Sequence, residues 1–157
     1  MKLSIYALIT SKGWEGAMQS IQEQMIVNLI LRHEKEIFVL DGLKGFEQEK
    51  HYTLIANAKE MPLIWLQSKS YPDQAFVCVD PYIVYPTYQP ELPEQDLEKL
   101  LVENADDLLI LCLTHVNHQM TINLVAPLLI NWNKGTAKQI IINNHNQYSL
   151  RHPLFNP

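Results

Sequence analysis

Two histidines three residues apart, His115 and His118 in the sequence HVNH, are the residues whose type and spacing best suit metal chemistry. On a helix, this spacing would present two imidazoles to one metal ion. Here the pair follows an extended apolar run, LLILCLT. In a strand, side chains three residues apart point to opposite faces. The favoured interpretation is therefore a turn that carries two polar histidines.

Two aspartates, Asp73 and Asp80, could in principle form the carboxylate pair that general acid–base catalysis requires. Each lies close to a proline, and a carboxylate in such a turn usually accepts hydrogen bonds from backbone N–H groups. Nothing in the sequence brings the two side chains face to face. The alternative function is a small β-barrel enzyme or metal-binding domain that uses Asp80 with His115 and His118.

Other catalytic patterns are weak. Ser149 and His152 lie near Arg151, but the G-x-S-x-G turn that exposes a nucleophilic serine does not occur. The five glycines are too scattered to form a phosphate-binding loop. Cys78 and Cys112 each lie in an apolar run, which is typical of small buried side chains in a reducing compartment. The sequence therefore predicts neither a catalytic residue nor a cofactor or metal.

Length and composition are those of one folded domain. The chain has 157 residues, of which 47% are hydrophobic and 18% are charged. No run approaches the ~18 apolar residues that a membrane span requires. The opening stretch MKLSIYALITSKG has no clear signal-peptide cleavage site. We expect a monomeric, cytoplasmic protein that does not bind membranes.

Charge is distributed unevenly along the chain. Residues 91–107 hold seven acidic residues and one lysine, a net charge of −6, whereas residues 115–157 hold three basic residues and no acidic one. A local negative field repels nucleic acid and attracts basic proteins. We therefore expect Glu94, Asp96 and Glu98 to contact a partner, and no direct binding of nucleic acid. The alternative is a solvated helix face without a partner.

Short strands are predicted along most of the chain, because runs of β-branched, aromatic and aliphatic residues alternate with turn residues. Their spacing indicates an antiparallel sandwich or a small barrel. The predicted strands are residues 25–31, 36–40, 52–55, 63–67, 75–79, 82–85, 108–114, 122–125, 128–131 and 139–142.

One or two short helices are also predicted. Residues 94–102 follow Pro93, which suits a first helical turn, and place leucines on one face with acidic residues opposite. We expect this helix to end at Asn104 or Ala105. A second helix is predicted over residues 14–24, although a glycine interrupts it.

Three further residues are predicted to be structural. Gly42 and Gly45 lie in a tight connection where a positive φ is expected. Arg151 stands alone in an acid-free part of the chain, and we expect it to reach a carboxylate or backbone carbonyls elsewhere in the fold.

The segment FVCVDPYIVYPTY, residues 76–88, combines an apolar run with two prolines and three tyrosines. Proline cannot donate to a sheet ladder, so it belongs at edges or bulges. The segment is therefore a candidate sheet edge, and edges with tyrosines are sites where another chain docks. We predict that Tyr82, Tyr85 and Tyr88 contact a partner. The alternative is that they pack within a closed sheet.

Five segments occur in the order and spacing that characterise the flagellar assembly factor FliW family, which the chain resembles over about residues 25–154. Each segment is weak alone, whereas the combination is specific. The segments are VLDGLKGFE (39–47), WLQS…YPDQAFVCVDPYIVYPTY (65–88), NLVAPLLIN (123–131), KGTAKQIII (134–142) and YSLRHPL (148–154).

The resemblance implies an all-β, mainly antiparallel, small β-barrel-like protein without enzymatic activity. It also implies two partners, flagellin and the RNA-binding translational repressor CsrA, whose antagonism would control flagellin synthesis. Residues 25–157 are expected to form this single domain, and residues 1–24 an N-terminal extension. The matched motifs place structural residues at Asp80, Pro81, Asn123, Pro127 and His152.

Overall fold

The computed structural model describes residues 14–155 and contains nine strands. They are β1 (Glu34–Val39), β2 (His51–Ile55), β3 (Ile64–Ser68), β4 (Ala75–Val79), β5 (Leu108–Val116), β6 (Met120–Ile122), β7 (Leu128–Asn131), β8 (Thr136–Gln139) and β9 (His152–Pro153). The helices are α2 (Trp14–Arg32), α3 (Pro81–Val84) and α4 (Glu94–Lys99), with short 3-10 turns η1 (Ala58–Glu60), η2 (Ala105–Asp107) and η3 (His145–Gln147).

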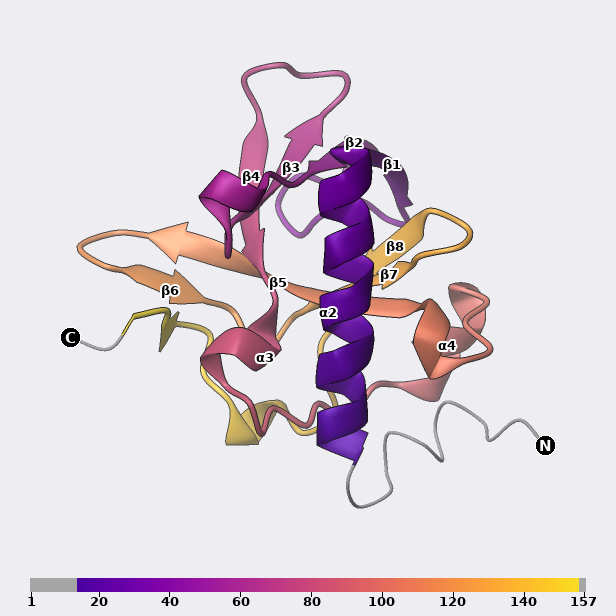
Figure 1. The fold of residues 1–157 in the computed structure, drawn as a ribbon, viewed down its shortest axis with the longest axis vertical. Helices are drawn as coiled ribbons and strands as arrows, with labels where there is room; N and C mark the ends of the chain where they lie inside the picture. Colours follow the sequence, from indigo (N-terminus) through magenta and orange to yellow (C-terminus); the bar gives the residue numbers. More distant parts are fainter. Residues whose placement is uncertain (1–13, 156–157) are drawn as a thin grey trace.

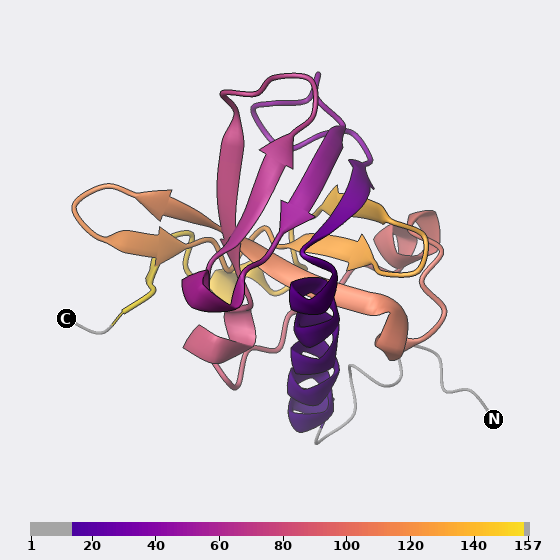
Figure 2. The same ribbon diagram turned by 45° about the horizontal axis from the view of Figure 1, so that its top comes forward.

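Seven strands close into a barrel in the order β4-β3-β2-β1-β8-β7-β5, and pairing of β4 with β5 completes the ring (Figure 1, Figure 2). Strands β6 and β9 continue the sheet outward from β5 as a projecting arm. Among the strands of residues 14–155, only β1 and β8 pair in parallel; the other pairs are antiparallel. The predicted all-β, mainly antiparallel barrel is confirmed.

Strand β5 is apolar throughout its first half because it separates two hydrophobic clusters. Leu109 and Leu111 point into the barrel. There they belong to a hydrophobic cluster to which all of the other barrel strands contribute side chains. Leu108, Ile110 and Cys112 belong to the second cluster, on the outer face of β5. Since side chains alternate between the two faces of a strand, both sets of alternate positions must be hydrophobic.

Helix α2 crosses the barrel beside β5 (Figure 1). Its second half is residues 25–31, and the prediction of a strand there is wrong. Met25, Ile26 and Leu29 join the cluster inside the barrel, at the spacing of one helix face. The predicted helix over 14–24 forms its first part, so the predicted division after residue 24 falls inside one continuous helix. Residues 1–13 lie outside the described residues.

Three other predicted boundaries are wrong. Helix α4 does not reach residue 104 or 105, because Leu101 takes a φ of 58° and the amide of Val102 donates to the carbonyl of Leu97 at 3.1 Å. The strand predicted over 122–125 ends at Ile122. The strand predicted over 139–142 ends at Gln139, after which the chain bonds to the loop before β7.

Candidate partner-binding surfaces

The tyrosine segment does not form a sheet edge. Strand β4 pairs with β3 on one side and with β5 on the other. Residues 82–85, which were predicted to form a strand, instead belong to helix α3 and its C-cap residue Tyr85. The side chains of Tyr82 and Tyr88 are 0% exposed. In this structure these two residues therefore present no surface to a partner. Tyr85 is half-buried, and its ring centroid lies 5.5 Å from that of Tyr148.

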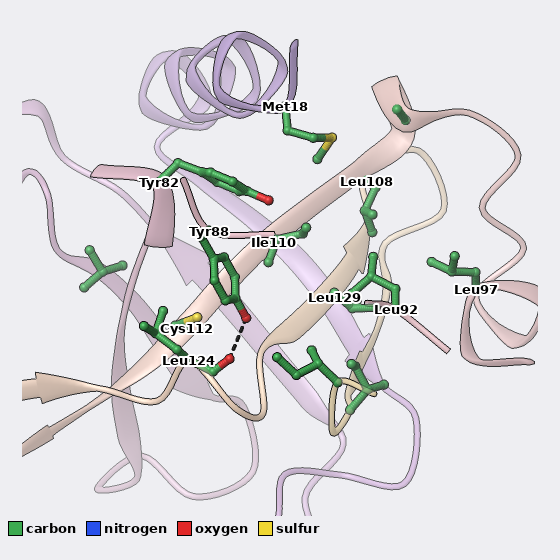
Figure 3. Packing of buried hydrophobic residues seen from close by; sticks show 14 of the residues in the cluster. Met18, Tyr82, Tyr88, Leu92, Leu97, Leu108, Ile110, Cys112, Leu124 and Leu129 are labelled. Atoms are coloured by element: carbon green, nitrogen blue, oxygen red, sulfur yellow. Dashed lines mark hydrogen bonds between the residues drawn. The ribbon is translucent and has the colours of Figure 1, made fainter. Parts of the chain in front are cut away.

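Tyr82 and Tyr88 pack on the outer face of β5, in the cluster that also holds Met18 and Ile110 (Figure 3). The Tyr88 hydroxyl donates a hydrogen bond to the carbonyl of Leu124 at 2.6 Å. Burial raises the pKa of Tyr88, so the hydroxyl keeps the proton that it donates. These contacts attach the segment after β4 to the barrel.

Asp80 and Pro81 start helix α3. The Asp80 carboxylate accepts the backbone N–H of Tyr82 at 3.0 Å, and Pro81 occupies the first helical position. The same Oδ1 accepts from Nε2 of Gln22 in α2 at 2.7 Å. Burial raises the pKa of Asp80 to about 6, although both hydrogen bonds oppose this shift. One buried carboxyl group thus joins α2 to α3.

The side chain of Gln22 takes the place of a missing strand beside β5. Its Nε2 donates to the carbonyl of Ile110 at 2.8 Å, and its Oε1 accepts the amide of Ile110. Two residues further along β5, Cys112 pairs with Val79, the last residue of β4. Alternate residues of an antiparallel strand bond to the same neighbouring strand, so the backbone groups of Ile110 face the side of β4. Since β4 ends at Val79, no strand residue is left to bond with Ile110 on that side. Sequence reasoning missed Gln22, whose only signal is a glutamine on the apolar helix face.

The structure does not assemble the alternative site of His115, His118 and Asp80. Since Val79 pairs with Cys112 in antiparallel register, Asp80 and His115 lie about four residues apart along the strands, roughly 13 Å. Asp80 is buried, whereas both histidines are exposed. Within residues 14–155, no group of three or more His, Cys, Asp or Glu could hold a metal ion. The geometry therefore does not favour the metal or enzyme alternative.

Cys78 and Cys112 are both buried and form no disulfide bond, as the sequence predicts. They lie on the adjacent strands β4 and β5, where Cys78 pairs with Leu113 and Cys112 with Val79. Burial raises the pKa of the Cys78 thiol to about 12 and also raises that of Cys112. Both therefore remain neutral thiols and act as small core side chains.

The acidic segment surrounds α4 at one side of the barrel (Figure 1). Asp96, which was expected to contact a partner, is 7% exposed and forms a salt bridge with Lys138 of β8. This ion pair instead ties α4 to the barrel. The exposed acids of this segment, here called the acidic surface, are Glu91, Glu94, Glu98, Glu103 and Asp106.

A groove of about 500 Å³ separates α4 from the connection between β1 and β2. Asp41 and Glu47 line one wall, and Gln95 lines the other. The amide of Lys44 donates to Oε1 of Gln139 at 2.9 Å, which anchors the connection on β8. The lining also includes Lys44 and the Asp96–Lys138 ion pair, so the groove adds little net charge to the acidic surface.

Both glycines of this connection have positive φ values, as the sequence predicts, but their surroundings differ. Gly42 has a φ of 67°, and a Cβ there would lie 2.7 Å from the backbone of Glu47. Gly45 has a φ of 89°, and a Cβ there would meet no atom within 4 Å. At position 42, glycine is therefore favoured both by the positive φ and by the lack of space for a Cβ. At position 45 it is favoured by the positive φ alone.

The C-terminal motif residues have different roles. Asn123 Oδ1 accepts the amides of Val125 and Ala126, each at 3.0 Å, and so forms the turn before Pro127. The His152 ring packs against Tyr85, with 5.4 Å between the ring centroids.

Arg151 does not make its predicted structural contact. Its side chain is exposed, and among residues 14–155 it has neither an ion pair nor a hydrogen bond. It instead lines a hollow that also contains His115 and His118.

The fold and these surfaces define a small closed β-barrel whose few buried polar and acidic groups hold its elements together and whose other charged groups lie on its surface. No helix in the described part of the chain is long and apolar enough to cross a membrane.

The family model described as "FliW protein" matches residues 19–154, and the chain belongs to the FliW family. The match begins inside α2, ahead of the predicted start at residue 25. A flagellar assembly factor FliW of Thermotoga neapolitana is 38% identical over 126 residues, which cover 77% of this chain and 84% of the relative. That of Syntrophus aciditrophicus is 36% identical over 109 residues, covering 68% and 69%.

The fold is also similar to a crystal structure of the flagellar assembly factor FliW. The two share 34% sequence identity with a TM-score of 0.70, over 77% of this chain and 86% of the other. The likeness therefore extends over most of the chain and is not limited to one motif.

Proposed function

We propose that this protein is a non-enzymatic cytoplasmic regulator of flagellar assembly that binds flagellin and the translational repressor CsrA. The observation that carries the proposal is the match to the FliW family over residues 19–154. Binding to CsrA prevents the repressor from blocking flagellin synthesis. Free flagellin occupies the protein and releases CsrA, so export of flagellin restores synthesis.

The acidic surface suits the repressor. A protein that grips RNA presents basic side chains to phosphates, and an acidic surface offers the same side chains a matching charge. Glu94 and Glu98 are exposed at α4, where they are free to meet a basic partner. Exposed charges of this kind act mainly on the rate of association.

Flagellin binds outside the buried tyrosine cluster. Tyr82 and Tyr88 have no accessible surface, so they support the fold on which a partner docks. The proposed switch requires that flagellin and CsrA either overlap on the surface or favour different states of the protein. In the second case the coupling between them is reciprocal.

Competition between purified proteins tests the proposal. The complex with CsrA is formed first, flagellin is added, and free CsrA is followed by size-exclusion chromatography. We expect each partner to bind alone and flagellin to release CsrA. A stable ternary complex at saturation would eliminate the exclusive switch, and failure of both partners to bind would refute the proposed function.

A further inference from the structure

A hollow of about 350 Å³ lies where the β5–β6 hairpin meets the C-terminal segment. Arg151 reaches this place because it precedes β9, whose His152 pairs with Ile122 of β6. The hairpin supplies the other lining residues. The complete lining is His115, Asn117, His118, Gln119, Thr121 and Arg151.

The hollow contains hydrogen-bond donors and a fixed cation but no carboxylate. The groove beside α4 contains Asp41, Glu47 and Asp96, and two further hollows contain Glu49 and Glu36. Residues 115–157 contain no acidic residue at all. The charge of Arg151 is therefore not neutralised by any described neighbour.

We propose that this hollow binds a carboxylate from an acidic segment of a partner protein. The Arg151 guanidinium can donate two parallel hydrogen bonds to one carboxylate, a geometry that lysine cannot provide. The imidazoles and the amide groups of Asn117 and Gln119 supply further donors. Leu150, next to Arg151 in the chain, is 61% exposed and adds an apolar contact. A central arginine with an apolar neighbour is typical of protein interfaces.

Charge argues for a peptide carboxylate and against nucleic acid. Binding of a polyphosphate chain requires several clustered cations, whereas the lining holds one arginine. The chain has a net charge of −5, which disfavours approach of a long polyanion. A short acidic segment needs only the local charge of the hollow.

The hollow is separate from the acidic surface. In Figure 1 and Figure 2 the β5–β6 hairpin and α4 lie on opposite sides of the barrel. Opposite charges therefore face opposite directions, and an acidic segment can bind at the hollow while a basic partner occupies the surface around α4. The inference thus goes beyond the proposed function and does not depend on it.

Titration of the full-length, ¹⁵N-labelled protein with an acetylated peptide of alternating glutamate and leucine tests the site. We expect saturable shifts in the amides of residues 115–121 and in the Nε–H signal of Arg151. Because Arg151 is exposed, Arg151→Gln should fold normally, as its melting temperature will check. The variant should weaken binding by about tenfold, since it removes a charge-assisted bidentate contact. Lys99→Gln, which removes an exposed cation on α4, should change affinity by less than about twofold.

Four outcomes would overturn the proposal. Equal affinity of the wild type and Arg151→Gln would show that the guanidinium is not involved, and an absence of saturable shifts at millimolar peptide would show that no site exists. Equal binding of a peptide with glutamine in place of glutamate would exclude carboxylate recognition. Competition by inorganic phosphate or a short RNA as strong as that by the acidic peptide would assign the hollow to phosphate.

Discussion

At neutral pH the buried carboxyl group of Asp80 lowers the stability of the fold. Replacing Asp80 with asparagine should remove this cost. Asp80 is 1% exposed, and its Oδ2 has no hydrogen-bond partner in the described part of the chain. Its Oδ1 accepts from Gln22 and from the amide of Tyr82. An asparagine Oδ1 can accept the same two hydrogen bonds, but the side chain cannot ionise. The substitution therefore isolates the effect of charge.

The size of the effect follows from the pKa of Asp80, which burial raises from 3.8 to about 6. The folded protein thus binds the proton more tightly than the unfolded chain does. The resulting stability is fully present below about pH 4 and is lost as the pH rises through about 6. A difference of about two pKa units corresponds to about 3 kcal/mol of unfolding free energy.

Urea unfolding of the wild type and Asp80→Asn at a series of pH values from about 3 to about 7.5 measures this effect. The difference in unfolding free energy between the variant and the wild type should rise by about 3 kcal/mol over this range. The corresponding relative gain in melting temperature is roughly 6–12 °C for a chain of this length. The amide nitrogen that replaces Oδ2 can carry a cost of its own that does not depend on pH. Such a cost would shift the whole curve of the free-energy difference against pH without changing its slope.

Other groups affect both proteins equally. Burial disfavours the charged form of Glu49, yet hydrogen bonds from Ser68, His51 and Ser70 lower its pKa to about 2. The stability it contributes is present above about pH 4.5 and is lost as the pH falls through about 2, so it cancels in the difference. Asp73→Asn, at an exposed carboxylate, is the matched control. Parallel curves for Asp80→Asn and the wild type would show that ionisation of Asp80 does not lower the stability of the fold.

Reversing Glu94 and Glu98 to lysine should slow association with CsrA by roughly tenfold at low salt and flatten its salt dependence, measured by stopped flow; unchanged rates would leave only a solvated face. Gly42→Ala should lower the unfolding free energy by about 2 kcal/mol or more, and Gly45→Ala by about 1 kcal/mol, because only the first also creates a clash. Equal costs in urea unfolding would contradict this difference. Tyr88→Phe should cost about 1–2 kcal/mol, because a buried carbonyl loses its donor, and an unchanged melting temperature would argue against that contact.

The barrel was predictable from sequence where a strand is a short apolar run between turn residues. The strand predicted over 75–79 matches β4, and the one over 108–114 matches most of β5. The prediction over 25–31 failed because it followed the β-branched and aliphatic composition. Met25, Ile26 and Leu29 also have helical spacing, and packing against the barrel favours the helix.

At the candidate site, the structure differs from the prediction mainly at the tyrosine segment, which is not a sheet edge. Asp80-Pro81 carries a helix-start signal, with an N-cap residue followed by proline, but proline was interpreted as evidence for a sheet edge. Burial of Tyr82 and Tyr88 depends on the turn that this helix introduces, which returns the chain across β5. The Gln22 contacts reach residues 58 and 88 positions away, and no local pattern reveals such pairings.

Strand β5 connects the two charged regions of the molecule. It begins directly after Asp107, at the end of the acidic segment, and extends to His115 beside the hollow. Between these ends, Ile110 is held by Gln22 and by the neighbouring strand β7. A partner at either region therefore meets a strand fixed at its centre. The proposed exclusion between flagellin and CsrA would therefore require overlap on the surface and not a signal carried along β5, since coupling over distance requires an element with two discrete arrangements.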